Sequence, residues 1–273
     1  MTPPTPEPPQ VLGSLTSHGV TFLYAHRVLR DVARDLSRCI SRPLSREVDI
    51  YVGVHTIRQP QETGRLRVGL QTEHILDRDG NRMWRFVKRR QRRVFAQSYD
   101  ALLDLSPDNA TAYDFLEADL RQKIQFGPHI FPDDDIEHEF VDAPPLFFGS
   151  LNDRRRGILD RLKSVRPLEI ASHGTFGAGL DKLLATHGSV LNIHYQEAEY
   201  AEYPRFLKAY LAGKPFISEP LSAPLVAGLH YLELNEVATR ERTEHVFGSI
   251  RTLASGYRLR NYLERVIQSH VAR

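Results

Sequence analysis

From Val20 onward the chain alternates short runs rich in β-branched and aromatic residues with amphipathic runs at helical spacing. The first pair is the apolar segment at 20–25 and a run in which Leu29, Leu36 and Ile40 recur on one side. Such alternation is typical of a parallel sheet with helices on both faces. It predicts a doubly wound, Rossmann-like α/β fold, in which ligands bind beyond the carboxyl ends of the strands.

The same reasoning places the other elements. In the first half, strands are expected at 49–54, 67–72, 101–105 and 123–126, and helices at 82–96 and 108–120. In the second half, strands are expected at 146–149, 168–172, 190–195, 215–219 and 230–234, and helices at 153–163, 178–186, 204–212, 236–253 and 258–271.

Residues 128–145 interrupt the alternation with prolines and an acidic run, and are predicted to be an interdomain linker. We therefore expect two Rossmann-like domains, at 11–127 and 146–273, that face each other across a cleft. The sequence does not decide whether the last helix packs on the second domain or back on the first. The proline-rich residues 1–10 are predicted to be a disordered leader rather than a signal peptide.

Within the linker, Asp133, Asp134 and Asp135 imitate an Asp-x-Asp metal-binding motif. Their place between prolines, away from any predicted strand end, favours a solvated linker without a metal.

Charge and cysteine content exclude several classes of protein. Lys and Arg total 36 against 34 for Asp and Glu, and a net charge of +2 is too near neutral for a nucleic-acid binder overall. The one cysteine, Cys39, forms no intrachain disulfide and is expected to be a small core residue, which fits a reducing compartment. No apolar run approaches the roughly 20 residues that span a membrane. We expect a cytoplasmic protein, with at most peripheral contact to the inner face of a membrane.

The turn after the first strand of the second domain is predicted to bind an anion. Gly149 permits a tight turn, and Ser150 or Asn152 can cap the following helix. The N–H groups at that helix start favour an anion, whose oxygens Arg154 or Arg155 could hold. The alternative is an ordinary capped helix with a solvated basic first turn, although arginines there oppose the helix dipole.

A second polar group follows the strand expected at 190–195. Asn192 and His194 lie two residues apart, so a strand would put both on one face, near its carboxyl end. Glu202 and Arg205 are spaced i,i+3 on the approach to a helix and could form one polar patch.

Three segments carry a resemblance to a known family: "FFGSLNDRRRGILDRL", "VLNIHYQEAEYAEYPRFLKAYLAGKPFISE" and "GLQTEHILD". In their order and spacing they resemble bacterial GT-B glycosyltransferases, in particular the short enzymes similar to those of spore-coat and capsule polysaccharide biosynthesis. The resemblance covers about 67–233. It implies a nucleotide-diphosphate-sugar donor in the second domain, a glycan, lipid-linked or small-molecule acceptor in the first, and no other cofactor.

By the same resemblance, Gly149 lies beneath the pyrophosphate and Arg155 stands where relatives have a phosphate-binding Lys. The donor pocket would then be lined by Asn192, His194 and Tyr195. The sequence departs from the pattern at Lys208, where many retaining relatives carry a ribose-binding Glu. Glu202 is the expected substitute.

Glycosyl transfer requires stabilisation of the leaving diphosphate, which arginines and helix N–H groups can supply without a metal. An inverting enzyme also needs a base for the acceptor hydroxyl. The residues that follow strands of the first domain offer His26, His55, Glu73 and His74. Glu73 ranks first, followed by His55 and then His74, because Glu73 lies in the matching "QTEH" segment. For most of them a hydrogen-bonded loop residue is the simpler interpretation.

A basic run begins at Lys88 and ends at Arg93, on the helix expected at 82–96. It is either a charged outer face or, from Arg82 to Arg93, a contact for an anionic membrane surface or a lipid-diphosphate acceptor. Two other functions remain open: a non-catalytic GT-B-like module that binds a nucleotide or glycan, and a nucleic-acid-binding protein that uses this run. The near-neutral net charge argues against nucleic acid as a partner.

Overall fold

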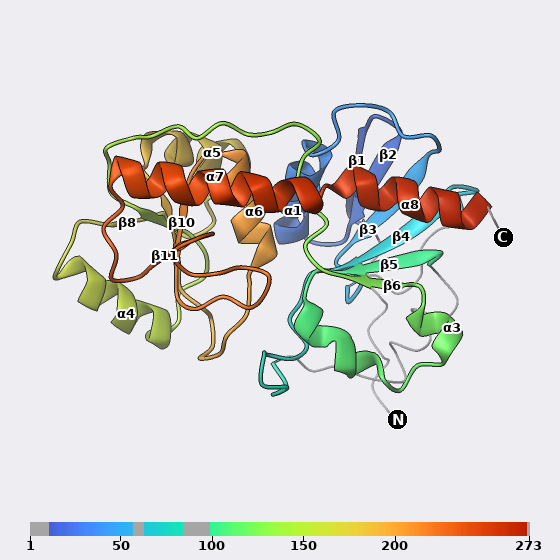
Figure 1. Ribbon diagram of the computed structural model, residues 1–273, viewed down its shortest axis with the longest axis horizontal. Coiled ribbons are helices and arrows are strands. Elements are labelled where there is room, and N and C mark those ends of the chain that lie inside the picture. Colours follow the sequence, from blue (N-terminus) through green and yellow to red (C-terminus); the bar gives the residue numbers. More distant parts are fainter. Residues whose placement is uncertain (1–10, 57–62, 84–98, 272–273) are drawn as a thin grey trace, which may run out of the picture. The chain divides into compact units, whose positions relative to one another are not determined.

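The computed structural model describes residues 11–56, 63–83 and 99–271, which divide into two compact units (Figure 1). Unit 1 consists of the described parts of Met1–Leu76, Arg82–Asp133 and Tyr257–Arg273. Unit 2 consists of Asp77–Asn81 and Asp134–Gly256. The change of unit at Asp133 falls inside the expected linker. The C-terminal assignment differs from the expected second domain at 146–273, because residues from Tyr257 onward belong to unit 1.

Unit 1 is built, among the described residues, on a six-stranded sheet in the order β1-β2-β3-β4-β5-β6. Its strands are β1 (Gly13–Ser17), β2 (Val20–Tyr24), β3 (Val48–Val52), β4 (Leu66–Gln71), β5 (Ala101–Asp104) and β6 (Ile124–Phe126). Strands β2 to β6 are parallel, and β1 pairs antiparallel with β2. The strand order follows the chain, so this sheet shows no reversal among its described strands.

The hairpin between β1 and β2 was not predicted from the sequence. His18 and Gly19 form its two-residue turn with φ of +48° and +81°. Positive φ at both positions is what a type I′ hairpin turn requires.

The helical elements of unit 1 are α1 (Arg27–Ser37), η1 (Pro107–Tyr113), α3 (Ala118–Arg121) and α8 (Leu259–Val271). The single helix expected at 108–120 is wrong, because the segment forms the 3₁₀ helix η1 and the one-turn α3 instead. Helix α8 is tied to the loop before β3, where Glu264 accepts hydrogen bonds from the backbone N–H and hydroxyl of Ser45. The helix expected at 82–96 lies largely outside the described residues.

Asp133 is part of the packing of unit 1 rather than a solvated linker residue. It is 3% exposed, and its carboxylate accepts hydrogen bonds from the backbone N–H and hydroxyl of Ser41. Its backbone N–H donates to the carbonyl of Cys39, which is itself fully buried as expected. Asp134 and Asp135 are exposed. The expectation of a solvated acidic run was therefore wrong for Asp133.

Unit 2 has, among the described residues, a five-stranded parallel sheet in the order β11-β10-β9-β7-β8. Its strands are β7 (Leu146–Phe147), β8 (Glu169–Ile170), β9 (Val190–Asn192), β10 (Phe216–Ser218) and β11 (Leu232–Glu233). The first strand, β7, lies between β8 and β9, so the order reverses there. This is a doubly wound sheet, and the crevice beyond the carboxyl ends of β7 and β9 is where such sheets bind ligands.

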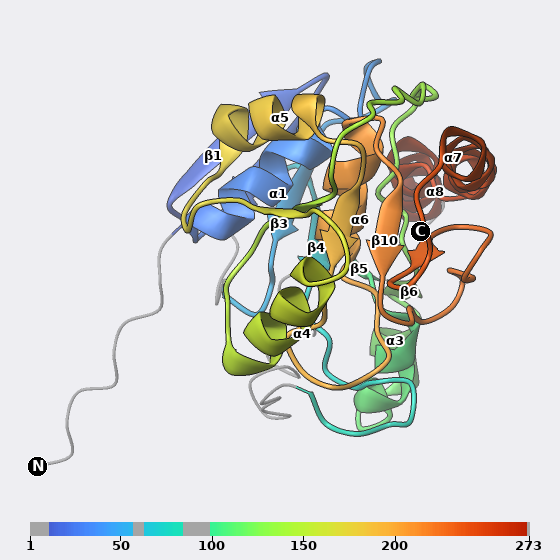
Figure 2. The same cartoon turned by 90° about the vertical axis from the view of Figure 1, so that its left-hand side faces the viewer.

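The helices of unit 2 are α4 (Asp153–Lys163), α5 (Gly177–Thr186), α6 (Tyr203–Leu211) and α7 (Arg240–Gly256). Helix α6 lies beside β10 in both views (Figures 1 and 2), and Phe206 packs edge-on against Phe216 at 5.1 Å between ring centroids. The helix expected at 236–253 starts only at Arg240. No helix within the described residues is long and apolar enough to cross a membrane.

Candidate functional site

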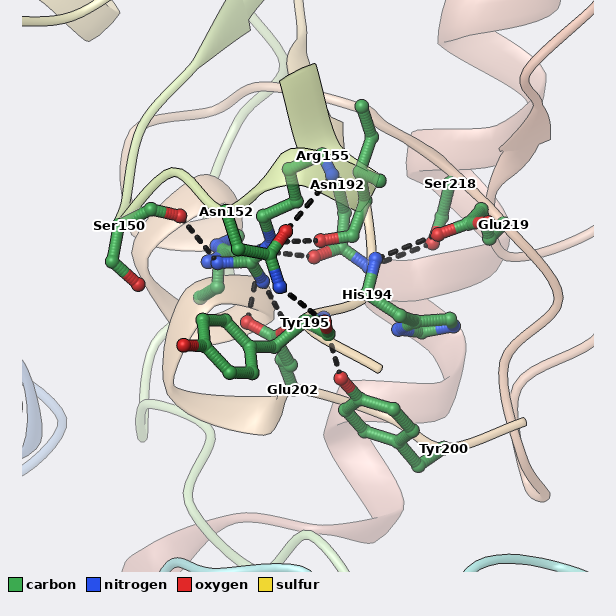
Figure 3. Close-up of polar contacts among 12 residues, drawn as sticks. Ser150, Asn152, Arg155, Asn192, His194, Tyr195, Tyr200, Glu202, Ser218 and Glu219 are labelled. Atoms are coloured by element: carbon green, nitrogen blue, oxygen red, sulfur yellow. Dashed lines mark hydrogen bonds and ion pairs between the residues drawn. The ribbon is translucent and has the colours of Figure 1, made fainter. Parts of the chain in front are cut away.

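The turn between β7 and α4 lies at the reversal of the unit 2 sheet. Gly149 has a φ of +130°, a conformation that favours glycine. Asn152 caps α4, since its Oδ1 accepts a hydrogen bond from the N–H of Arg155 at 2.9 Å. Its Nδ2 donates to the carbonyl of Tyr195 at 2.7 Å, which ties this turn to the segment after β9 (Figure 3). The cap therefore also joins the two strand ends.

Arg155 points into the protein, where it is only 2% exposed. Its Nε donates to the carbonyl of Ile193 at 2.8 Å, its Nη1 to the carbonyl of Ser150 at 2.9 Å, and its Nη2 to Glu202 at 2.8 Å. Burial lowers the pKa of Arg155, and the neighbouring charge of Arg205 lowers it further. A solvated basic first turn is therefore wrong for this residue. Arg155 braces the Gly149 turn against the end of β9.

Glu202 joins two arginines. Its Oε1 accepts from Arg155, and its Oε2 lies 2.8 Å from Nη1 of Arg205, the pair expected from their spacing. The same Nη1 donates to Oδ1 of Asn192, and the Asn192 amide donates to the hydroxyl of Ser218 at 2.9 Å. The polar side chain at the end of β9 is thus linked to β10 on one side and to α6 on the other.

Arg154 belongs to a separate ion pair that sequence reasoning missed. Both of its terminal nitrogens contact Glu219, at 3.0 and 2.5 Å. Glu219 also accepts from the N–H of His194 at 2.7 Å. Burial would raise the pKa of Glu219, but these hydrogen bonds outweigh it and hold the pKa below its usual range. The available signal was position, because Glu219 is the first residue beyond β10.

The segment after β9 leaves the strand at Asn192, earlier than expected. His194 is buried, and burial lowers its pKa. Its Nε2 lies 2.8 Å from the carbonyl of Pro220 and must carry the ring proton, since a carbonyl only accepts. The Tyr200 ring lies 4.2 Å from this ring at a tilt of 33°, and its hydroxyl accepts from the N–H of Tyr195. Tyr195 itself is 48% exposed, and the guanidinium carbon of Arg155 lies 5.3 Å from the centre of its ring.

Lys208 is buried in α6 and lies 3.3 Å from Asp181 of α5. Its side chain therefore takes part in the contact between two helices.

The first-domain residues gather at the carboxyl edge of the unit 1 sheet. His55, after β3, has its Nε2 3.6 Å from the carboxylate of Glu73, after β4, and its Nδ1 3.3 Å from Oε1 of Gln71. Glu73 keeps 40% of its side chain exposed. His74 is the next residue and is half-buried, whereas His26 is exposed at the start of α1. The structure therefore brings together the two highest-ranked residues.

Among residues 11–56, 63–83 and 99–271 there is no cluster of three His, Cys, Asp or Glu side chains that could hold a metal ion. The basic run from Lys88 to Arg93 lies outside the described residues.

No family model and no curated protein sequence matches the chain. Two crystal structures of HepE from Anabaena match it in three dimensions. The complex with UDP-glucose is 12% identical, with a TM-score of 0.51 over 90% of this chain and 82% of HepE. The complex with UDP and glucose is 12% identical, with a TM-score of 0.50 over 90% and 80%. The chain shares its fold with HepE. This confirms an α/β chain with parallel sheets, as in GT-B glycosyltransferases.

Proposed function

We propose that the protein is a glycosyltransferase in which unit 2 binds a nucleotide-diphosphate-sugar and unit 1 binds the acceptor. The arginine cluster at the reversal of the unit 2 sheet carries this proposal, because a doubly wound sheet binds ligands at that point. The matching HepE structures were solved with UDP-glucose and with UDP and glucose, which supports a uridine diphosphate donor as the first to test.

The charges of this cluster suit an anion. Arg154, Arg155 and Arg205 contribute three positive charges, and Glu202 and Glu219 two negative ones, which leaves a net charge of +1. The N-terminus of α4 opens on the same turn, and its backbone N–H groups add partial positive charge. A diphosphate would be attracted to this end of the sheet.

The three arginines are not equivalent as phosphate ligands. Arg154 and Arg155 direct their guanidinium groups at carboxylates and backbone carbonyls. Arg205 uses Nη1 for Glu202 and Asn192, whereas its Nη2 contacts no acceptor among the described residues. This Nη2 lies over the Gly149 turn, where a Cβ would come within 2.8 Å of it. We assign the diphosphate contact to Arg205 and the supporting role to Arg155.

In the proposed reaction the acceptor oxygen forms a bond to the anomeric carbon of the sugar. The bond from that carbon to the diphosphate oxygen breaks, and its electron pair stays on the diphosphate, which Arg205 stabilises. For an inverting outcome the acceptor proton passes to the carboxylate of Glu73, which becomes neutral, and His55 holds that side chain in place at 3.6 Å. The reaction as proposed needs no metal. The acceptor is a glycan, a lipid-linked sugar or a small molecule, and the run from Arg82 to Arg93 is the proposed contact with anionic lipid.

The proposal is tested by a thermal-shift screen of nucleoside diphosphates and their sugars, followed by assay of sugar release from any donor that binds. A ligand that binds only the folded state raises the melting temperature. At a hundred times its Kd it adds about 2.7 kcal/mol to the free energy of unfolding. We expect a uridine diphosphate sugar to stabilise the protein and to be hydrolysed slowly. Tight binding without turnover would support the non-catalytic module. Salt-dependent binding of nucleic acid without nucleotide-sugar binding would contradict the proposal.

A further inference from the structure

The loop that carries Glu73 is held by a buried amide to which the proposed chemistry gives no role. Asn109 of η1 is fully buried, and its Oδ1 accepts hydrogen bonds from the N–H groups of Ile75 at 2.8 Å and Leu76 at 3.0 Å. Its Nδ2 donates to the carbonyl of Glu73 at 3.0 Å. One side chain therefore fixes three backbone groups within four consecutive residues.

Asp104 fixes the orientation of that amide. It is the last residue of β5, is fully buried, and accepts from the Asn109 Nδ2 at 3.0 and 3.1 Å. It also accepts from the N–H of Ser106 at 2.9 Å and the hydroxyl of Tyr113 at 2.6 Å. A reversed amide would place its oxygen against the carboxylate and its NH₂ against two N–H donors. Only the observed orientation satisfies both sides of Asn109.

The held segment begins at the proposed base. Gln71 accepts from the N–H of Glu73 at 3.4 Å, and Asn109 holds the Glu73 carbonyl, so the backbone is fixed on both sides of this side chain. The carboxylate lies 3.6 Å from His55, which is itself oriented by Gln71. An exposed glutamate on an unrestrained loop would lose side-chain and backbone freedom on reaching the same position.

We propose that Asn109 and Asp104 are positioning residues that hold Glu73 beside His55 for proton transfer from the acceptor. This proposal rests on the proposed function of the His55–Glu73 pair. Neither residue contacts substrate, because both are fully buried. Displacement of a catalytic group by about 1 Å can cost on the order of a hundredfold in rate.

A double-mutant cycle between Asn109→Ala and Glu73→Gln tests whether Asn109 acts through Glu73. We expect Asn109→Ala to lower kcat by about ten- to a hundredfold and to leave UDP affinity unchanged, since UDP binds unit 2. In the Glu73→Gln background the same substitution should change kcat by less than about twofold, because the group it positions is already lost. An equal loss in both backgrounds, or no loss in either, would overturn the proposal. If Asn109→Ala does not fold, Asp104→Asn is taken through the same cycle.

Amide hydrogen exchange at Ile75 and Leu76 tests the same hydrogen bonds without reference to activity. Their N–H groups should exchange more slowly than those of exposed loops that lack such hydrogen bonds. They should exchange faster in Asp104→Asn than in the wild-type protein. Unchanged exchange would overturn the positioning role. If Glu73→Gln alone turned over like the wild type, the base assignment would fail, while the exchange rates would still decide whether Asn109 holds this loop.

Discussion

Replacing Arg155 by Ala should destabilise unit 2 rather than merely weaken ligand binding. The substitution removes three hydrogen bonds of a buried guanidinium, to the carbonyls of Ile193 and Ser150 and to Glu202. Hydrogen bonds to charged groups contribute roughly 1.5–3 kcal/mol each, and breaking a buried ion pair costs about 3–5 kcal/mol. Two effects reduce this loss: burial already disfavours the charged guanidinium, and Glu202 keeps Arg205 as a partner. We therefore expect a net loss of about 2–4 kcal/mol.

Differential scanning calorimetry measures this loss, and Arg156→Ala is the matched control. Arg156 is the next residue of α4, has 56% of its side chain exposed, and contacts only the exposed Asp153 among the described residues. At about 2–4 °C per kcal/mol for a chain of this size, Arg155→Ala should melt roughly 5–15 °C below the wild type. The Arg156→Ala control should melt at the wild-type temperature. A variant that melts like the wild type but no longer binds nucleotide would refute the bracing role. It would indicate that Arg155 contacts the nucleotide directly.

Three further outcomes follow from the geometry. Gly149→Ala should weaken binding of UDP in calorimetric titration without unfolding unit 2. The added Cβ displaces Nη2 of Arg205, and alanine is strained at a φ of +130°. Unchanged affinity would show that this turn does not contact the ligand. Asp133→Ala should lower the free energy of unfolding by about 1–3 kcal/mol, the cost of two lost hydrogen bonds, and so lower the melting temperature, whereas the exposed Asp135→Ala should not. EDTA should leave turnover unchanged. Loss of turnover in EDTA and in both variants would point to a metal. Burial raises the pKa of Asp104 to about 7 from an ordinary value of 3.8, so its stabilising contribution is complete below about pH 4 and is lost as the pH rises through 7. The difference in unfolding free energy between wild type and Asp104→Asn should therefore change across pH 4–7 by up to about 4 kcal/mol, and a flat difference would contradict the assignment.

Periodicity predicted the parallel sheets well because it depends on local sequence. Helix α4 begins and ends where its pattern places it, and Asn152 caps it as expected. The helix expected at 108–120 was lost to tertiary contacts, since Asn109 gives its side chain to Asp104 and to the loop after β4. Hairpin β1–β2 was missed although the pair His18-Gly19 suits its turn.

The site was harder to predict than the fold, because position at a strand end does not say which way a side chain points. Arg154 and Arg155 are adjacent in the sequence, yet one pairs with Glu219 and the other is buried against Glu202. Which arginine faces outward depends on where the segments after β9 and β10 lie. The sequence alone does not contain that information in any local pattern.

Calorimetric titration of UDP into the Arg205→Ala variant tests the central claim most directly. Arg156→Ala serves as the control, and thermal melts confirm that both variants are folded. The account predicts that Arg205→Ala weakens UDP binding by about ten- to a hundredfold, since a charge-assisted hydrogen bond contributes roughly 1.5–3 kcal/mol and 1.4 kcal/mol corresponds to a factor of ten. Arg156→Ala should bind UDP like the wild type. Equal affinities for all three proteins would contradict a diphosphate site at the reversal of the unit 2 sheet.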